Sequence, residues 1–218
     1  MQIQCLISKN SWVDDNYKNL IKIKFFAFSK KILFFNDHKK LRKNYDINLI
    51  FSYFKKIPSK YLKFSKFNLV IHGSDLPYGR GMSPISWQIL KGKSKIVFTL
   101  FEANKEYDTG KYYLKKTINF GNKSLLNEIK KKQFNEMVNL YLSFLKNHKK
   151  IKIKNQTGKS SYFRLRKSKD SKININKSIK EQFNLLRIVD NINYPAYFIY
   201  KNNKFKIKIT DYEKDNSK

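Results

Sequence analysis

The sequence predicts an α/β protein, with a Rossmann-like open sheet followed by a small α+β C-terminal extension. Three observations favour this fold class. Short apolar runs alternate with polar or helical segments, a pattern typical of a largely parallel sheet. A long amphipathic pattern at 122–147 predicts a helix that covers one face of that sheet. A basic, polar stretch at 146–161 then precedes a helix and a hairpin.

Six apolar runs are expected to form the strands of the sheet. Each run is short, rich in β-branched or aromatic residues, and bounded by polar or turn-forming residues. In chain order, the predicted strands are 2–7, 32–35, 47–51, 68–71, 96–101 and 112–118.

Three segments of the first unit are expected to contain helices. Segment 10–20 is predicted to form a loop and a helix. A helix is predicted at 83–91, with Ser83 as its N-cap and Pro84 in its first turn. The helix at 122–147 carries apolar residues with a helical spacing, so one of its faces is expected to be buried.

The basic stretch at 146–161 is expected to be a linker between two units. It contains the polar run NQTGKSS and follows the long helix. We therefore expect an α/β domain at 1–150 and a short C-terminal subdomain at 151–218. That subdomain is predicted to contain a helix at 179–188, a hairpin at 196–209 turning at Asn202 and Asn203, and a frayed tail at 211–218.

The chain is strongly basic. It has 47 Lys and Arg residues against 16 Asp and Glu, which gives a net charge of +31. Only five of these cations are arginines, the residue whose planar fork suits phosphate. We attribute the lysine excess to compositional drift in an A+T-rich coding sequence. A basic surface for nucleic acid or anionic substrates is the open alternative.

Composition also excludes several classes of protein. The single cysteine, Cys5, excludes internal disulfides and a cysteine-rich zinc site, and it is expected to be buried. No stretch approaches the roughly 20 apolar residues of a membrane span. The first eight residues are too short and mixed for a signal peptide. We expect a cytoplasmic protein with no membrane partner. A homodimer is left as an open alternative to a monomer.

The stretch HGSDLPYGRGMSP, 72–84, concentrates residues that shape loops. It holds five of the 11 Gly and Pro residues, directly after a predicted strand. His72 would lie at the carboxyl end of that strand, where open α/β sheets bind ligands. A structural histidine before an ordinary turn is the alternative. His38 and His148 lie among lysines and are expected at the surface.

These segments resemble the 10-formyltetrahydrofolate-dependent formyltransferases. That family carries Asn-x-His, then a Ser-Leu-Leu-Pro-x-x-x-Gly-like loop, then Asp-Thr/Ala-Gly. Here the corresponding segments are VIHGSDLPYGRGMSPISWQIL and, later, FEANKEYDTGKYYLK. Asp108 follows His72 by 36 residues, which matches the family spacing. The resemblance covers roughly 47–209, and within the family the chain is most similar to the sugar N-formyltransferases.

The resemblance implies both a mechanism and a set of site residues. His72 would polarise the formyl oxygen or shuttle a proton, and Asp108 would orient His72 or an ordered water. The formyl donor would be 10-formyltetrahydrofolate, its pteridine against the loop at 53–57, and no metal is implied. The implied cofactor-binding residues are Tyr53, Phe54, Lys55, Ile57, Gly81 and Tyr107.

The sequence departs from the family pattern at Val70. The family has an asparagine there, two residues before the histidine, which helps to hold the formyl oxygen. Losing such a donor typically costs about 10²–10³ in rate. Asn68 does not replace it, because four strand residues place it about 13 Å from His72.

The expected acceptor is a nucleotide-linked amino sugar of surface polysaccharide biosynthesis. Methionyl-tRNA formyltransferases carry a C-terminal β-barrel that helps to hold tRNA. Here only about 50 to 60 residues follow the linker, too few for a closed barrel. Sugar N-formyltransferases tolerate a reduced C-terminal region. Two alternatives stay open. One is methionyl-tRNA as acceptor, and the other is a non-catalytic folate-binding homologue.

Overall fold

A computed structural model describes residues 1–13 and 15–210, so the predicted tail at 211–218 lies outside the described residues. Its centre is a six-stranded sheet with the order β2-β1-β3-β4-β6-β7. The first four strands in this order are parallel, and β6 runs antiparallel to both of its neighbours, β4 and β7. The strands are β1 (Ile3–Ile7), β2 (Ile32–Phe35), β3 (Tyr45–Phe51), β4 (Ser65–His72), β6 (Lys95–Glu102) and β7 (Tyr112–Asn119).

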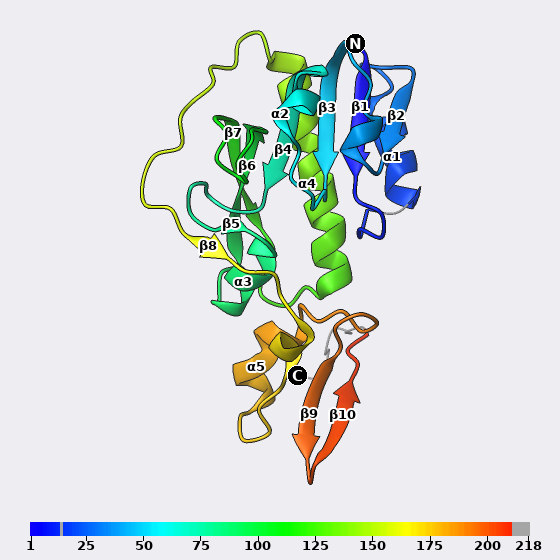
Figure 1. Ribbon diagram of the computed structural model, residues 1–218. Helices are drawn as coiled ribbons and strands as arrows, with labels where there is room; N and C mark the ends of the chain where they lie inside the picture. The colour runs from blue at the N-terminus through cyan, green and yellow to red at the C-terminus, as the bar shows by residue number, and fades with distance from the viewer. Residues whose placement is uncertain (14, 211–218) are drawn as a thin grey trace, which may run out of the picture.

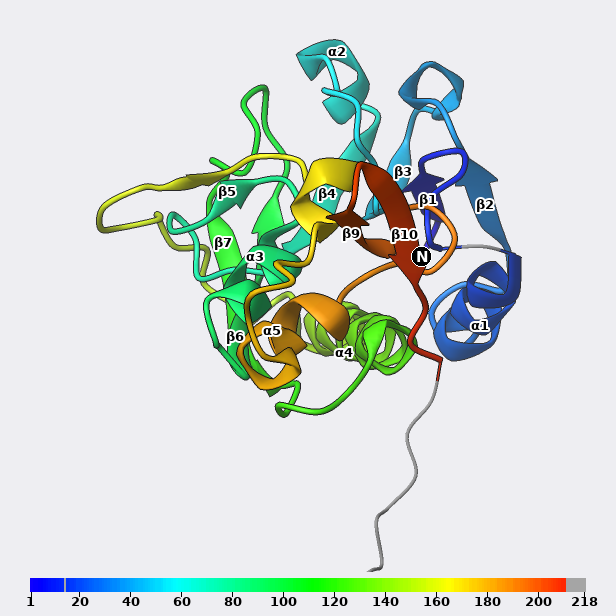
Figure 2. The ribbon, with the colours of Figure 1, turned by 90° about the horizontal axis from the view of Figure 1, so that it is seen from below.

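The two faces of the sheet are covered differently. Helices α1 (Asp15–Phe25) and α4 (Leu126–Asn147) lie on one face, and the short α2 (Ser59–Leu62) lies on the other (Figure 2). Along β4, Leu69 belongs to the large core under α4, whereas Val70 packs in a smaller cluster on the opposite face. Because strand side chains alternate, His72 lies on the same face of the sheet as Val70.

Helix α3 (Pro84–Leu90) follows β4 and the predicted loop, with Ser83 at its N-cap and Pro84 in its first turn as predicted. Ser83 has a φ of 53°, in the left-handed region, and its side chain makes no capping hydrogen bond. Its Oγ instead accepts from the Arg166 N–H at 3.4 Å. Helix α4 begins four residues later than predicted, because the Glu128 side chain accepts from the Leu125 N–H and sets the first turn there.

The predicted linker is not a free connection. Its Lys154 pairs with Tyr112, and β8 (Tyr162–Phe163) pairs in parallel with β5 (Arg80–Gly81). Figure 1 shows this segment running along the outside of β6 and β7 before it enters the C-terminal unit. These pairings involve one or two residues each, too few to produce the alternating pattern by which strands are predicted from sequence.

The C-terminal unit contains the predicted helix and hairpin. Helix α5 (Ile179–Leu186) and strands β9 (Ala196–Tyr200) and β10 (Asn203–Ile207) surround a small core of their own. The hairpin turns at Lys201 and Asn202, one residue earlier than predicted, and both have positive φ as a tight hairpin turn requires. The described residues also form two 3-10 helices, η1 (His38–Lys40) and η2 (Ser168–Ser171).

A buried arginine joins the C-terminal unit to the α/β body. Arg187, at the end of α5, is only 1% exposed, and burial lowers its pKa. Its guanidinium donates to the carbonyls of Ser124 and Gly121, which connect β7 to α4. A buried charge is tolerated only when its donors are satisfied in this way. No helix among the described residues combines the length and apolarity needed to cross a membrane.

Candidate functional site

His72 is the last residue of β4, at the carboxyl end of the parallel strands. It is buried, and its Nε2 lies 2.7 Å from the Gly79 carbonyl. A carbonyl only accepts hydrogen bonds, so Nε2 carries a hydrogen and donates it. Nδ1 is therefore the basic nitrogen of the neutral ring, and it lies 3.7 Å from Asp108 Oδ1.

Asp108 lies in the connection between β6 and β7. Its φ is 55°, an uncommon conformation for a residue with a side chain. Its second carboxylate oxygen, Oδ2, accepts from the Gly81 N–H at 2.8 Å. Gly81 has a φ of 94°, and a Cβ there would collide with the Phe163 carbonyl oxygen. The glycines of the loop thus allow its backbone to contact both His72 and Asp108.

A pocket of about 80 Å³ lies beside this pair. Its walls are the loop after β3, at 53–57, and the loop after β6, at 103–108. The lining residues are Ile50, Tyr53, Lys55, Lys56, Ile57, Val70, Phe101, Ala103, Asn104, Glu106, Tyr107 and Asp108.

Most of the residues that the resemblance implied line this pocket, namely Tyr53, Lys55, Ile57, Tyr107 and Asp108. Phe54, Gly81 and His72 are not lining residues. The Phe54 side chain is exposed and its N–H donates to Ser8 Oγ. Gly81 serves the site through its N–H, and His72 lies next to Asp108.

The two walls of the pocket touch each other. Lys56 Nζ lies 3.2 Å from Glu106 Oε2, and the Tyr107 hydroxyl donates to the Phe54 carbonyl at 3.4 Å. Ligand pockets commonly measure about 300–1,000 Å³. A pocket of about 80 Å³ is therefore smaller than a whole folate would need.

His38 supports the wall at Tyr53, so the prediction that His38 is a surface residue was wrong. Its side chain is buried against Tyr61, and its Nδ1 lies 2.7 Å from the Tyr53 hydroxyl. Burial lowers the pKa of His38, which favours the neutral ring. His148 is also partly buried, with its ring close to those of Phe67 and Phe144.

Glu102 was missed in the sequence, and it anchors the other wall. Burial raises its pKa to about 7. Its carboxylate accepts from the Asn68 N–H at 2.7 Å and from the Tyr113 hydroxyl at 2.9 Å. The Asn68 amide donates to the Leu62 carbonyl and accepts from Asn48. Asn68 therefore uses its side chain inside the fold, in agreement with the prediction that it does not replace the family asparagine.

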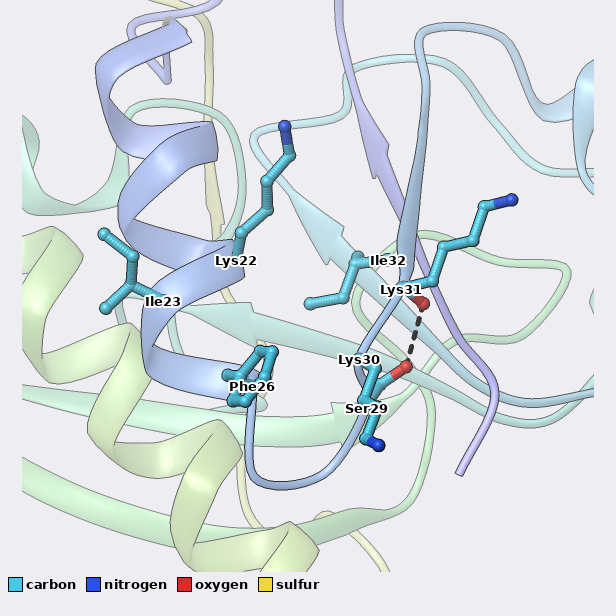
Figure 3. Close-up of a pocket in the computed structure, with 7 residues that line it drawn as sticks. All are labelled: Lys22, Ile23, Phe26, Ser29, Lys30, Lys31 and Ile32. Atoms are coloured by element: carbon cyan, nitrogen blue, oxygen red, sulfur yellow. Dashed lines mark hydrogen bonds between the residues drawn. The ribbon is translucent and has the colours of Figure 1, made fainter.

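A larger hollow, of about 560 Å³, lies between α1 and β2 (Figure 3). Its lining combines apolar side chains with lysines, and Figure 3 shows the Lys22 and Lys31 amines reaching away from its apolar floor. It contains none of the residues of the His72 site. Within the described part of the chain, no cluster of histidine, cysteine and carboxylate side chains could hold a metal ion.

The family model described as formyl transferase matches residues 15–145. The chain belongs to the formyl transferase family. The resemblance expected from the two sequence segments is thereby confirmed. Formyl transferases use 10-formyltetrahydrofolate as formyl donor, as expected. His72 and Asp108 both lie within the matched region.

Methionyl-tRNA formyltransferase of Mycoplasma mycoides subsp. mycoides is a formyl transferase of similar sequence. The identity is 30% over 178 residues, which cover 80% of this chain and 55% of that protein. The chain thus spans about half the length of the curated relatives that it matches.

Solved structures confirm the formyltransferase fold. Methionyl-tRNA formyltransferase from Clostridium thermocellum has a TM-score of 0.78 at 19% identity, over 98% of this chain and 94% of that one. HypX from Aquifex aeolicus in complex with tetrahydrofolic acid has a TM-score of 0.79 at 18% identity, over 96% and 37%. A 4-N formyltransferase from Francisella tularensis has a TM-score of 0.71 at 18% identity, over 97% and 98%.

Proposed function

We propose that this formyl transferase moves the formyl group of 10-formyltetrahydrofolate to a primary amine. One observation carries the proposal. The His72–Asp108 pair lies at a pocket whose other wall is the loop at 53–57. An acid–base pair beside a pocket is the arrangement that acyl transfer to an amine needs.

The lining of the pocket fits a flat heterocycle with an anionic tail. Tyr53, Tyr107 and Ile57 offer aromatic and apolar surfaces, and Lys55 and Lys56 lie on the same wall. Both lysine side chains are more than half exposed, so they can meet a carboxylate at the mouth. When bound, the donor supplies an activated formyl group.

The residues of the chain account for the movement of protons. The neutral amine attacks the formyl carbon, the new C–N bond forms, and the bond to the folate nitrogen breaks. One proton leaves the amine and one proton joins the folate nitrogen, so the exchange balances. His72 takes the proton at Nδ1, because Nε2 is committed to Gly79. Asp108, 3.7 Å away, stabilises the resulting imidazolium.

The developing negative charge on the formyl oxygen needs a donor that Val70 does not provide. Val70 lines the pocket, so the departure from the family lies at the reacting region. Among the described lining residues, Asn104 carries the one amide side chain. Its Oδ1 accepts from the Glu106 N–H and the Thr109 hydroxyl, which leaves Nδ2 for another acceptor. We assign Asn104 as the substitute donor.

Two acceptor classes each have an observation in their favour. A nucleotide-linked amino sugar is supported by the fold shared with a sugar N-formyltransferase from Shewanella, over 99% of this chain and 100% of that one. Methionyl-tRNA is supported by the sequence relative from Mycoplasma mycoides and by a net charge of +31, which suits a polyanion.

The test is a turnover assay with the purified chain and 10-formyltetrahydrofolate. Tetrahydrofolate release and the mass of the acceptor are measured with methionyl-tRNA and with a panel of nucleotide-linked amino sugars. Turnover with one class assigns the acceptor. Binding of 5-formyltetrahydrofolate without any turnover would favour the non-catalytic homologue. Absence of both binding and turnover would contradict the proposed function.

A further inference from the structure

We infer that Gln156, from the segment predicted as a linker, is a positioning residue for Asp108. The Gln156 amide nitrogen donates to two carbonyls, that of Asp108 at 2.9 Å and that of Gly110 at 2.8 Å. Its oxygen accepts from Arg80 at 2.7 Å. One side chain thus joins the linker, the loop before α3 and the loop that carries Asp108.

The backbone around Asp108 needs such a contact. Asp108 has a φ of 55°, and conformations of this kind persist only where the surroundings hold them. Two residues on, the chain runs against β6 so closely that a Cβ on Gly110 would collide with the Glu102 carbonyl oxygen. Gln156 binds the carbonyls at both ends of this bend, so it fixes the direction in which the Asp108 side chain leaves the backbone.

Arg80 determines which way round the Gln156 amide lies. A guanidinium only donates hydrogen bonds, so it selects the amide oxygen and turns the nitrogen towards the two carbonyls. The next residue, Gly81, donates its N–H to the Asp108 carboxylate. Residues 80–81 therefore hold Asp108 twice, the backbone through Gln156 and the carboxylate directly.

The burial pattern singles out Gln156 within its segment. It is partly buried, whereas its neighbours at 152–155 and 157–160 are all exposed. The segment continues onto the same loop, where Ser161 Oγ accepts from the Gly79 N–H and the Ser161 carbonyl accepts from the Arg80 N–H. Residues 154–163 therefore complete a site whose two acid–base residues lie in the matched region, 15–145.

The first test needs no enzymatic activity. Hydrogen exchange of the Gly81 amide, measured by NMR on the full chain, reports whether the Asp108 carboxylate is in place. We expect Asp108→Ala and Gln156→Ala each to accelerate this exchange at least about tenfold. Amides of the central strand β3 should stay unchanged. The matched control is Asn155, the neighbouring residue, whose side-chain amide is exposed. Asn155→Ala should leave exchange of the Gly81 amide at the wild-type rate.

A second variant separates the donor from the bulk of the side chain. Gln156→Glu keeps the size and the contact with Arg80, but it presents an oxygen to the two carbonyls. It should accelerate Gly81 exchange as much as Gln156→Ala. The positioning role is overturned if Gly81 exchange is unchanged in both Gln156 variants, or if it rises together with that of β3. It is also overturned if Asp108→Ala leaves Gly81 exchange unchanged.

The effect on turnover rests on the proposed function. Given turnover, Gln156→Ala should lower kcat about 10- to 100-fold and leave the KM for the donor unchanged, because Gln156 does not line the pocket. A raised KM with an unchanged kcat would contradict this. If the wild-type chain shows no turnover, the proposed function fails while the exchange measurement still decides the role of Gln156.

Discussion

His72 and Asp108 are held together by a shared loop rather than by a hydrogen bond of their own. Their nearest polar atoms are 3.7 Å apart, whereas the Gly79 carbonyl contacts His72 at 2.7 Å and the Gly81 N–H contacts Asp108 at 2.8 Å. The loop therefore sets the tautomer of one residue and the orientation of the other. Because Nδ1 of His72 makes no hydrogen bond to Asp108, it can take up or release a proton without breaking one.

Removing the imidazole should abolish most turnover. Without Nδ1 as proton acceptor, His72→Ala is expected to lose about 10²–10⁴ in kcat. Binding of 5-formyltetrahydrofolate should persist, because His72 does not line the pocket. Turnover and calorimetric binding are measured together, with His148→Gln as the control histidine. An unchanged kcat in His72→Ala would refute the assigned role.

Restoring the family asparagine should raise turnover at a cost in stability. Val70→Asn places an amide in the pocket lining and is expected to increase kcat by up to about 10²-fold. Val70 packs in the smaller apolar cluster, so the free energy of unfolding should fall by about 1–3 kcal/mol. Val70→Ala is the control for lost packing.

The same variant tests the substitute donor. Asn104→Ala should lower kcat in the wild type, because it removes the amide assigned to the formyl oxygen. It should have less effect in the Val70→Asn background, where a second amide is available. The four kcat values form a double-mutant cycle. Equal losses in both backgrounds would argue against Asn104 as substitute donor.

Glu102 should make stability fall as pH rises. Its pKa is raised from 4.5 to about 7, so the folded state holds the proton more tightly than the unfolded state. The contribution is complete below about pH 4.5 and is lost as pH rises through about 7. At about 1.4 kcal/mol per pKa unit, the loss approaches about 3 kcal/mol.

Glu102→Gln should remove that component of the pH dependence. The lowered pKa of His38 acts in the opposite sense, so the quantity to compare is the difference between variant and wild type across pH 5–8. Urea unfolding measures this difference in the free energy of unfolding. Glu106→Gln, at an exposed carboxylate, is the control. Parallel curves for wild type and Glu102→Gln would show that this carboxyl does not titrate in the range.

Breaking the contact between the two pocket walls should speed entry of the donor. Glu106→Ala removes the ion pair with Lys56 and frees that lysine for an anionic ligand. An exposed pair contributes about 0.2–1 kcal/mol, so association of 5-formyltetrahydrofolate should accelerate by a factor of about 2–5. Stopped-flow fluorescence measures the rate. Glu136→Ala, which removes a comparable pair with Lys116 elsewhere, should leave it unchanged.

The sequence predicted the elements that are built from local patterns. The six strands and the helices α3, α4 and α5 were expected near their observed bounds, because apolar runs and turn residues mark them. The approach of His72 to Asp108 followed from the family resemblance rather than from any local pattern.

Contacts between distant segments could not be predicted in the same way. Gln156 and Asp108 are 48 residues apart, and His38 meets Tyr53 across 15. A polar side chain in a basic stretch gives no periodic signal, and its partners are decided only when the loops pack. For the same reason the burial of His38 was missed and the segment at 146–161 resembled a free linker.

The buried guanidinium of Arg187 ties the melting of one unit to that of the other. The C-terminal core has only three buried apolar side chains among the described residues, Leu186, Val189 and Ala196, too few to sustain a fold alone. Its docking leaves the Arg187 charge satisfied by carbonyls of the α/β body. If the two units separated, the Arg187 guanidinium would lose its hydrogen bonds to the Ser124 and Gly121 carbonyls. We therefore expect the chain to unfold as one cooperative unit on heating, with a single transition in calorimetry.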